Sequence, residues 1–241
     1  MQPTHELLIF DDAGKMAEEA ARRLVARIHG SASPSVCLTG GSSPALLYKL
    51  LAAQPLRDEI PWDRVHWFIG DERFVPDGDP LSNIGMARGL FLASCAPREN
   101  VHAVPTDLGD LESAARAYEG TLRGFYGADR LDPARPLFDV VLLGVGPDGH
   151  VASLFPGSPQ EDGDRWVIGA AKANVAPFVP RITLTKRALA SCREMMLLVS
   201  GAGKRDIFAR IQRGEPLPAT QIHSDALTTW LVDRAAAGDA P

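Results

Sequence analysis

The chain has 241 residues, of which 45% are hydrophobic and 23% are charged, and its formal net charge is −5 at pH 7. These values are typical of a globular protein and exclude a disordered or fibrous chain. The negative charge also argues against nucleic acid and anionic membrane surfaces as partners, since both select dense patches of Lys and Arg.

The N-terminus and the cysteines indicate the compartment. The N-terminus lacks the basic start and apolar run of a signal peptide, and no segment approaches the roughly 20 apolar residues of a membrane span. Cys37, Cys95 and Cys192 form no C-x-x-C pair, so neither a disulfide framework nor a thiolate metal site is predicted. We therefore expect a cytoplasmic protein.

Short apolar runs alternate with longer helical patterns, which predicts an α/β fold with a mostly parallel sheet covered by helices. We expect a single domain over 1–241, with a disordered tail at about 235–241. Asp11 or Asp12 is the expected N-cap of the first helix. In chain order, the expected strands are Leu7–Phe10, Val36–Thr39, Val65–Ile69, Phe138–Leu143, Trp166–Ala170, Arg181–Leu184, Glu194–Ser200 and Thr229–Val232. The expected helices are Gly14–Ile28, Pro44–Ala53, Asn83–Leu92, Leu111–Gly127, Lys186–Ala190 and Gly203–Gln212.

The first glycine-bearing loop, Thr39-Gly40-Gly41-Ser42-Ser43-Pro44, follows an expected strand and leads into a helix. Glycines let the backbone approach an anion closely, the two hydroxyls can donate to it, and a helix N-terminus favours negative charge. The segment lacks the Walker A pattern and the dinucleotide-binding pattern. It is either a phosphate cradle or a plain strand-to-helix turn with a serine cap.

The second loop is Gly70-Asp71-Glu72-Arg73, directly after the expected strand Val65–Ile69. Ligands of open α/β sheets bind beyond the carboxyl ends of the strands, which is where these charges are expected to lie. A surface turn with an internal ion pair explains the same residues. The loop is therefore a candidate for the mouth of a binding site.

The third loop, Gly144-Val145-Gly146-Pro147-Asp148-Gly149-His150, is the most specific. Asp148 and His150 lie two residues apart, close enough in a curved loop for the carboxylate to orient the imidazole. An imidazole held in this way can take a proton from water near neutral pH. We interpret this loop as the catalytic one.

The remaining candidates are weaker. Lys204 follows an expected strand and Arg181 opens one. Both have the charge to bind a phosphate, although either could be a solvated surface charge. His102 and His223 are expected in loops without a partner. No pair of histidines or of histidine and carboxylate has the spacing of a zinc site, so no metal is predicted.

Four ordered segments together resemble the 6-phosphogluconolactonase family over nearly the whole chain. They are Leu38–Pro44, Gly70–Pro76 with Ser82-Asn83, Gly144–Pro156, and Arg181–Thr185. The related glucosamine-6-phosphate deaminases share the fold, but they typically carry a glutamate where this chain has Phe155 and a tyrosine where it has Arg73. A non-catalytic sugar-phosphate sensor on the same fold is the third possibility, although it would be expected to lose the pair Asp148 and His150.

The resemblance implies a Rossmann-like sheet with helices on both faces and hydrolysis of a phosphorylated sugar lactone without a cofactor. It implies that His150, oriented by Asp148, is the general base, and that Arg73 meets either the oxyanion or the phosphate. The phosphate would be bound by Gly40, Gly41, Ser42, Ser43, Arg181 and Lys204, and Asp71 would contact substrate. A monomer or weak homo-oligomer is expected.

Overall fold

The computed structural model describes residues 4–161, 163–173 and 175–238. Its main element is a seven-stranded sheet in the order β1-β10-β9-β6-β2-β3-β5, in which every neighbouring pair is parallel. In this order the strands are Thr4–Phe10, Leu227–Asp233, Cys192–Val199, Phe138–Gly144, Ser35–Leu38, His66–Ile69 and Val101–His102. The expected parallel α/β fold is therefore confirmed.

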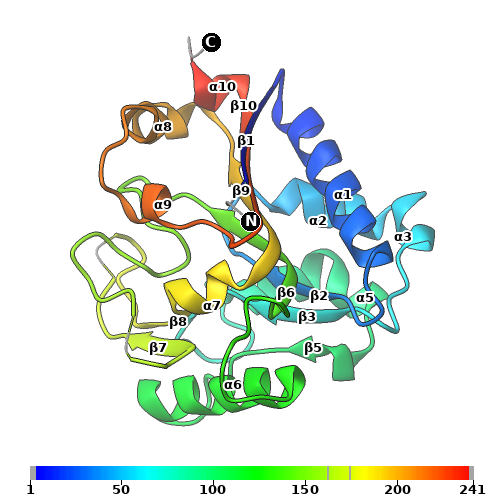
Figure 1. Cartoon of the computed structure of the whole chain (residues 1–241), viewed down its shortest axis with the longest axis vertical. Coiled ribbons are helices and arrows are strands. Elements are labelled where there is room, and N and C mark those ends of the chain that lie inside the picture. Colours follow the sequence, from blue (N-terminus) through cyan, green and yellow to red (C-terminus); the bar gives the residue numbers. More distant parts are fainter. Residues whose placement is uncertain (1–3, 162, 174, 239–241) are drawn as a thin grey trace.

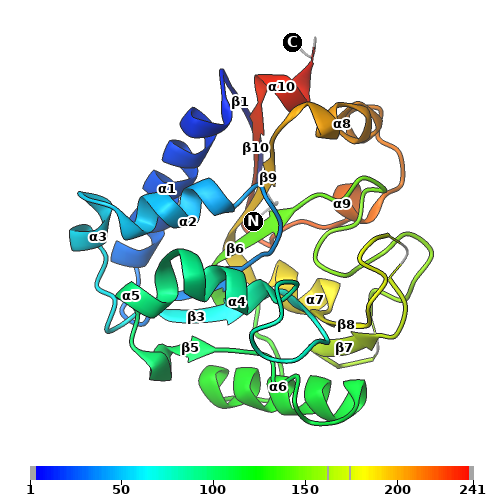
Figure 2. The same cartoon turned by 180° about the vertical axis from the view of Figure 1, so that it is seen from behind.

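Helices cover both faces of this sheet because its central strands are apolar on both sides. In β6, Val140 and Leu142 pack into a core with α1 (Ala13–His29) and α2 (Ala45–Ala52). Val141 and Leu143 pack into a second core with α6 (Leu111–Tyr126) and α8 (Arg205–Gln212). Figures 1 and 2 show α1 and α2 on one side of β9 and β10 and α8 on the other.

Local sequence signals set the ends of the longest helices. Asp12 is the N-cap of α1 and accepts a hydrogen bond from the Lys15 backbone N–H at 2.9 Å, so one of the two expected caps is correct. Asp110 caps α6 in the same way, and α6 ends at Tyr126, just before Gly127, whose φ of 73° suits glycine.

Two expected strands lie outside the parallel sheet. Val167–Ala170 (β7) and Arg181–Leu184 (β8) form a separate antiparallel sheet with Asp71–Arg73 (β4), in the order β4-β8-β7. Strand β4 was not expected, because three charged residues carry no apolar pattern. In this sheet Arg73 pairs with Arg181 and Asp71 pairs with Thr183, so the second loop is a paired strand and not a surface turn.

The smaller helical elements differ more from expectation. The expected helix Asn83–Leu92 is α4 (Asn83–Ala87), a π-helical turn (Arg88–Leu92) and α5 (Ala93–Cys95). A 3-10 turn (Ala202–Lys204) precedes α8, and α7 spans Lys186–Ala190 as expected. The prediction of a disordered tail at about 235–241 is wrong for its first residues, because Arg234–Ala237 form α10 with Ala236 and Ala237 buried. Residues 239–241 lie outside the described residues. Besides β4 and α10, the unexpected elements are α3 (Leu56–Glu59), a 3-10 turn (Arg98–Asn100), β5 and α9 (Pro218–Gln221).

The strand order reverses between β2 and β6. From β2 the chain adds β3 and β5 toward one edge of the sheet, whereas from β6 it adds β9 and β10 toward the other. Such a reversal opens a crevice beyond the carboxyl ends of the two central strands. Within the described ranges, no helix combines the length and hydropathy needed to cross a membrane.

Candidate active site

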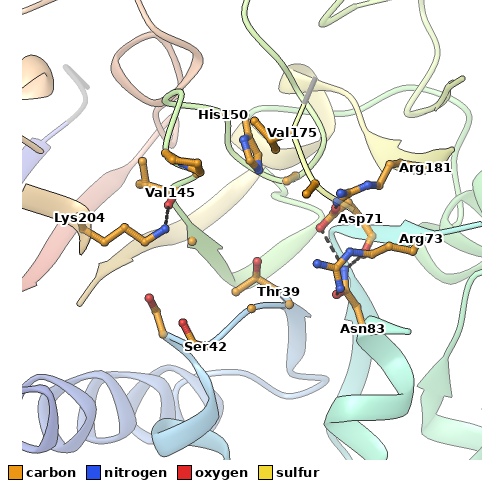
Figure 3. A pocket seen from close by; sticks show the side chains of 18 residues that line it. Thr39, Ser42, Asp71, Arg73, Asn83, Val145, His150, Val175, Arg181 and Lys204 are labelled. Carbon is orange, nitrogen blue, oxygen red and sulfur yellow. Dashed lines mark hydrogen bonds and ion pairs between the residues drawn. The ribbon is translucent and has the colours of Figure 1, made fainter. Parts of the chain in front are cut away.

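A cavity of about 180 Å³ lies at this reversal point, beyond the ends of β2 and β6. Its lining brings together residues from all three loops and from β8 (Figure 3). It contains every predicted site residue except Asp148, namely Gly40, Gly41, Ser42, Ser43, Asp71, Arg73, His150, Arg181 and Lys204. The convergence of the loops that the sequence suggested is therefore present in the structure.

Asp148 lies behind the histidine ring and not in the cavity wall. Its Oδ1 is 2.5 Å from Nδ1 of His150 and also accepts a hydrogen bond from the His150 backbone N–H at 3.2 Å. Because Nδ1 is engaged, Nε2 is the ring nitrogen left for a molecule in the cavity. The aspartate thus holds the imidazole in one orientation.

Two neighbours fix the position of the His150 ring. The ring of Phe155 lies beneath it, with the two ring centroids 4.8 Å apart. On another side is Gly146, where a Cβ atom would lie 2.0 Å from the ring atoms Nδ1 and Cε1. Glycine is therefore required at position 146 by the closeness of the imidazole.

The loop after β2 forms the cavity wall opposite His150. Gly41 has a φ of 89°, in the left-handed region, and a Cβ on Gly40 would lie 1.9 Å from Oδ1 of Asn83. Pro44 precedes α2, and no described side chain caps the helix. The Ala45 backbone N–H donates to the Ser42 carbonyl at 3.3 Å, and the N-terminal end of the helix as a whole favours an anion. Both alternatives for this segment contain a strand-to-helix turn, and its place in the cavity favours the phosphate cradle.

Arg73, Asp71 and Asn83 form a hydrogen-bonded cluster at one end of the cavity. The Asn83 amide accepts from Nη1 of Arg73 at 2.5 Å and donates to the backbone carbonyl of Asp71 at 2.7 Å. The Asp71 carboxylate accepts from the Ser153 hydroxyl at 2.6 Å and lies 3.9 Å from Nη1 of Arg181. Sequence reasoning gave Asn83 and Ser153 no role, although both stand in the segments that carry the family resemblance.

Arg181 is an almost buried cation in the cavity lining. Its side chain donates to the Pro177 carbonyl at 3.0 Å, and its Nε has no hydrogen-bond partner among the described residues. Burial lowers the pKa of Arg181, and the nearby Asp71 carboxylate opposes that shift. A desolvated guanidinium whose Nε is unpaired among the described residues favours an anionic ligand.

Lys204 supplies a second cation on another side of the cavity. Its Nζ donates to the Val145 carbonyl at 2.6 Å, and burial lowers its pKa while Asp148 raises it. Figure 3 shows Lys204 on the same side as Ser42, whereas Arg181, Arg73 and Asn83 lie on the opposite side. The cavity therefore has cationic groups at two ends, with His150 between them.

The histidines outside the cavity need one correction. His102 lies in β5 and not in a loop, and its Nε2 is 3.0 Å from Nδ1 of His66. The prediction that His102 has no partner was therefore wrong, because a two-residue strand leaves no sequence pattern. Among the described residues, no three His, Cys, Asp or Glu side chains are grouped so as to hold a metal ion.

Comparison with known proteins identifies the family. The family model of glucosamine-6-phosphate isomerases/6-phosphogluconolactonase matches residues 11–230. The 6-phosphogluconolactonase of Streptomyces coelicolor is 40% identical, with 100% of this chain and 97% of that protein covered. That of Mycobacterium tuberculosis is 39% identical, with 97% of each chain covered.

Solved structures show the same relationship. The 6-phosphogluconolactonase of Thermotoga maritima has a TM-score of 0.81 at 31% identity, covering 95% of this chain and all of that one. A monomeric glucosamine-6-phosphate deaminase has the same fold, with a TM-score of 0.81 at 20% identity and 96% and 98% of the two chains covered. The chain therefore belongs to the glucosamine-6-phosphate isomerase/6-phosphogluconolactonase family.

Proposed function

We propose that this chain hydrolyses 6-phospho-D-glucono-1,5-lactone to 6-phospho-D-gluconate, the second step of the oxidative pentose phosphate pathway. The observation that carries the proposal is the hydrogen-bonded pair of Asp148 and His150, with the free ring nitrogen of His150 beside a cavity that has cationic groups at two ends. The family relationship supports it, since the Streptomyces coelicolor and Mycobacterium tuberculosis relatives at 39–40% identity over nearly the full length are 6-phosphogluconolactonases. No cofactor is needed for this hydrolysis.

The chemistry follows from ester hydrolysis. Nε2 of His150 takes a proton from a water molecule as its oxygen bonds to the lactone carbonyl carbon, and Asp148 stabilises the resulting imidazolium. The tetrahedral intermediate then collapses, the bond from the carbonyl carbon to the ring oxygen breaks, and the imidazolium returns the proton to that oxygen. Arg73 is the candidate donor to the oxyanion, an interaction typically worth about 3 to 4 kcal/mol of barrier.

The phosphate is held away from the bond that breaks. The backbone and hydroxyls of Gly40, Gly41, Ser42 and Ser43 provide donors for a phosphate, and Lys204 and Arg181 provide a cation at each of the two ends of the cavity where it can bind. Anchoring at a distance positions the lactone without joining the chemistry. Because Lys204 and Arg181 lie at different ends of the cavity, substrate comparisons are needed to separate their roles.

The deaminase alternative lacks its proton relay in this chain. Phe155 is fully buried beneath His150, and its apolar ring also lies 5.9 Å from the Arg181 guanidinium carbon. A phenyl ring cannot carry a proton, so opening of an amino-sugar ring has no assistance from this position. We also propose a cytoplasmic location and a monomeric or weakly associating state; the free thiols of all three cysteines fit a reducing compartment.

An assay with two substrates tests the proposal. Freshly made 6-phosphoglucono-δ-lactone and glucosamine 6-phosphate are each incubated with the enzyme and with a no-enzyme control. We expect lactone hydrolysis above the spontaneous rate and no release of ammonia. Ammonia release without lactone hydrolysis would overturn the proposal in favour of a deaminase.

A further inference from the structure

Glu72 is a buried carboxylate beside the cavity that the proposed chemistry does not use. It stands between Asp71 and Arg73 in β4, and successive side chains of a strand point to opposite faces. Its neighbours line the cavity, whereas Glu72 is 1% exposed and points to the other face of the strand. No Lys or Arg side chain forms an ion pair with it in the described part of the chain.

Four hydrogen-bond donors converge on this carboxylate. Oε1 accepts from the backbone N–H groups of Arg73 at 2.8 Å and Asn83 at 2.7 Å. Oε2 accepts from the Ile84 backbone N–H at 2.8 Å and the Ser82 hydroxyl at 3.2 Å. Burial raises the pKa of Glu72, and the three backbone donors oppose that shift because they favour the charged form.

These bonds fasten the first turn of α4 to strand β4. Ser82, which donates to Glu72, is also the N-cap of α4 and accepts from the Gly85 backbone N–H at 3.0 Å. Asn83 and Ile84, the first two residues of α4, give their backbone N–H groups to Glu72. The carboxylate therefore determines where α4 begins relative to β4.

Asn83 connects the Glu72 carboxylate to the residues that line the cavity. With its backbone held by Glu72, Asn83 places its amide oxygen on the Arg73 guanidinium and its amide nitrogen on the Asp71 carbonyl. The same amide packs directly against Gly40 of the phosphate-cradle loop. One residue of α4 thus contacts both sides of the cavity.

We propose that Glu72 is a positioning residue, which holds Asn83 and, through it, the Arg73 guanidinium in the geometry that the reaction requires. This inference rests on the proposed lactonase function. Only a carboxylate suits the position, because an ionised carboxylate is acceptor-only on both oxygens. A glutamine would turn an NH₂ group toward two of the four donors and leave them without an acceptor.

The test is the isosteric change Glu72→Gln combined with changes at the two ends of the cavity. We expect Glu72→Gln to lower kcat/KM for the phosphorylated lactone by about 10- to 100-fold, as for a misplacement of about 1 Å. In an Arg73→Ala background the same change should cost little more, because the group that Glu72 positions is already absent. In a Lys204→Ala background the full loss should remain.

Asp139→Asn is the matched control for loss of a buried carboxylate. Asp139 accepts hydrogen bonds from the Ser35 backbone N–H at 3.0 Å and from Nε of Arg193 at 3.0 Å. It lies near the start of β6, whereas the cavity lies beyond the carboxyl end of that strand. We expect Asp139→Asn to lower the melting temperature and to leave kcat/KM unchanged. A stability effect alone would make the two variants behave alike.

The outcomes separate this inference from the proposed function. In one outcome the wild type hydrolyses the lactone while Glu72→Gln lowers kcat/KM equally in the Arg73→Ala and Lys204→Ala backgrounds. That result would overturn the positioning role alone. Absence of wild-type turnover above the no-enzyme rate would overturn the proposed function; the same double-variant comparison is then made on the dissociation constant of 6-phosphogluconate. If Glu72→Gln does not fold, Ser82→Ala takes its place, because it removes one of the four donors. The loss of kcat/KM in Ser82→Ala should then also be smaller in the Arg73→Ala background than in wild type, with a smaller coupling than for Glu72→Gln. If Ser82→Ala shows no such coupling, the positioning role is overturned.

Discussion

Replacing Gly146 by alanine should remove most of the activity without removing the fold. The added Cβ would lie 2.0 Å from Nδ1 and Cε1 of His150 and 2.7 Å from Cγ. Because carbon atoms in contact are separated by about 3.5 Å, the ring must move by roughly 1.5 Å. That movement also pulls Nδ1 away from Asp148. A displacement of about 1 Å typically costs about 100-fold in rate, so we expect kcat to fall about 100-fold, or about 2.7 kcal/mol of barrier.

Gly144→Ala, at the end of β6 and in the lining of the same cavity, is the matched control for adding a methyl group to the cavity wall. The nearest atom to a Cβ at this position is the Gly40 carbonyl oxygen at 3.9 Å, an ordinary contact distance. Initial rates are measured with fresh phosphorylated lactone after subtraction of spontaneous hydrolysis, and thermal melts report the folded state. A folded Gly146→Ala enzyme with wild-type kcat, or equal losses in the two variants, would refute the argument that His150 must keep this position.

Three further predictions concern binding and stability. Arg181→Ala should mainly raise KM for the phosphorylated lactone; steady-state kinetics in which kcat falls and KM stays constant would place Arg181 at the reacting carbonyl instead. Lys204→Ala should lower kcat/KM more for the phosphorylated lactone than for the unphosphorylated glucono-lactone. Equal losses of kcat/KM on both substrates would show that Lys204 does not contact the phosphate. Burial, reinforced by His66, lowers the pKa of His102 to about 4, below its unfolded value near 6.5. The stability that depends on neutral His102 is therefore complete above pH 6.5 and declines as the pH falls toward 4. Because solvent screens the half-buried pair of His66 and His102, the free energy of unfolding of wild type should fall by only about 1 to 2 kcal/mol between pH 6.5 and pH 4. The free energy of unfolding of His102→Phe, measured by urea titration at pH 6.5 and pH 4, should fall by less than that of wild type. An equal fall in the two proteins would contradict the assignment of this pH dependence to His102.

The sequence predicts the parts of the fold that local patterns determine. The helix expected at Gly14–Ile28 is Ala13–His29, and the strand expected at Phe138–Leu143 is Phe138–Gly144, because each has a strong apolar pattern and clear end signals. The partners of a strand are set by distant segments. For that reason the expected strand at Arg181–Leu184 has the right bounds, but its place in a second, antiparallel sheet could not be read from the sequence.

The same distinction applies to the site. The glycine loops and the pair Asp148 and His150 carry their own signal, since unusual residues stand close together after a strand. Asn83 and Ser153 contact the site through partners outside their own segments: Asn83 bonds to Asp71, 12 positions earlier, and Ser153 bonds to Asp71, 82 positions earlier. Glu72 is similar, because its role depends on the first turn of a helix that begins 11 residues later. Such roles appear only once the fold brings the segments together.

The most direct test of the account is the kcat of His150→Ala on freshly made 6-phosphoglucono-δ-lactone, with the spontaneous rate subtracted at each pH. If Nε2 of His150 activates the attacking water, general-base catalysis of about 100- to 10,000-fold should be lost while KM changes little. A folded His150→Ala enzyme that keeps the wild-type kcat would contradict the central claim.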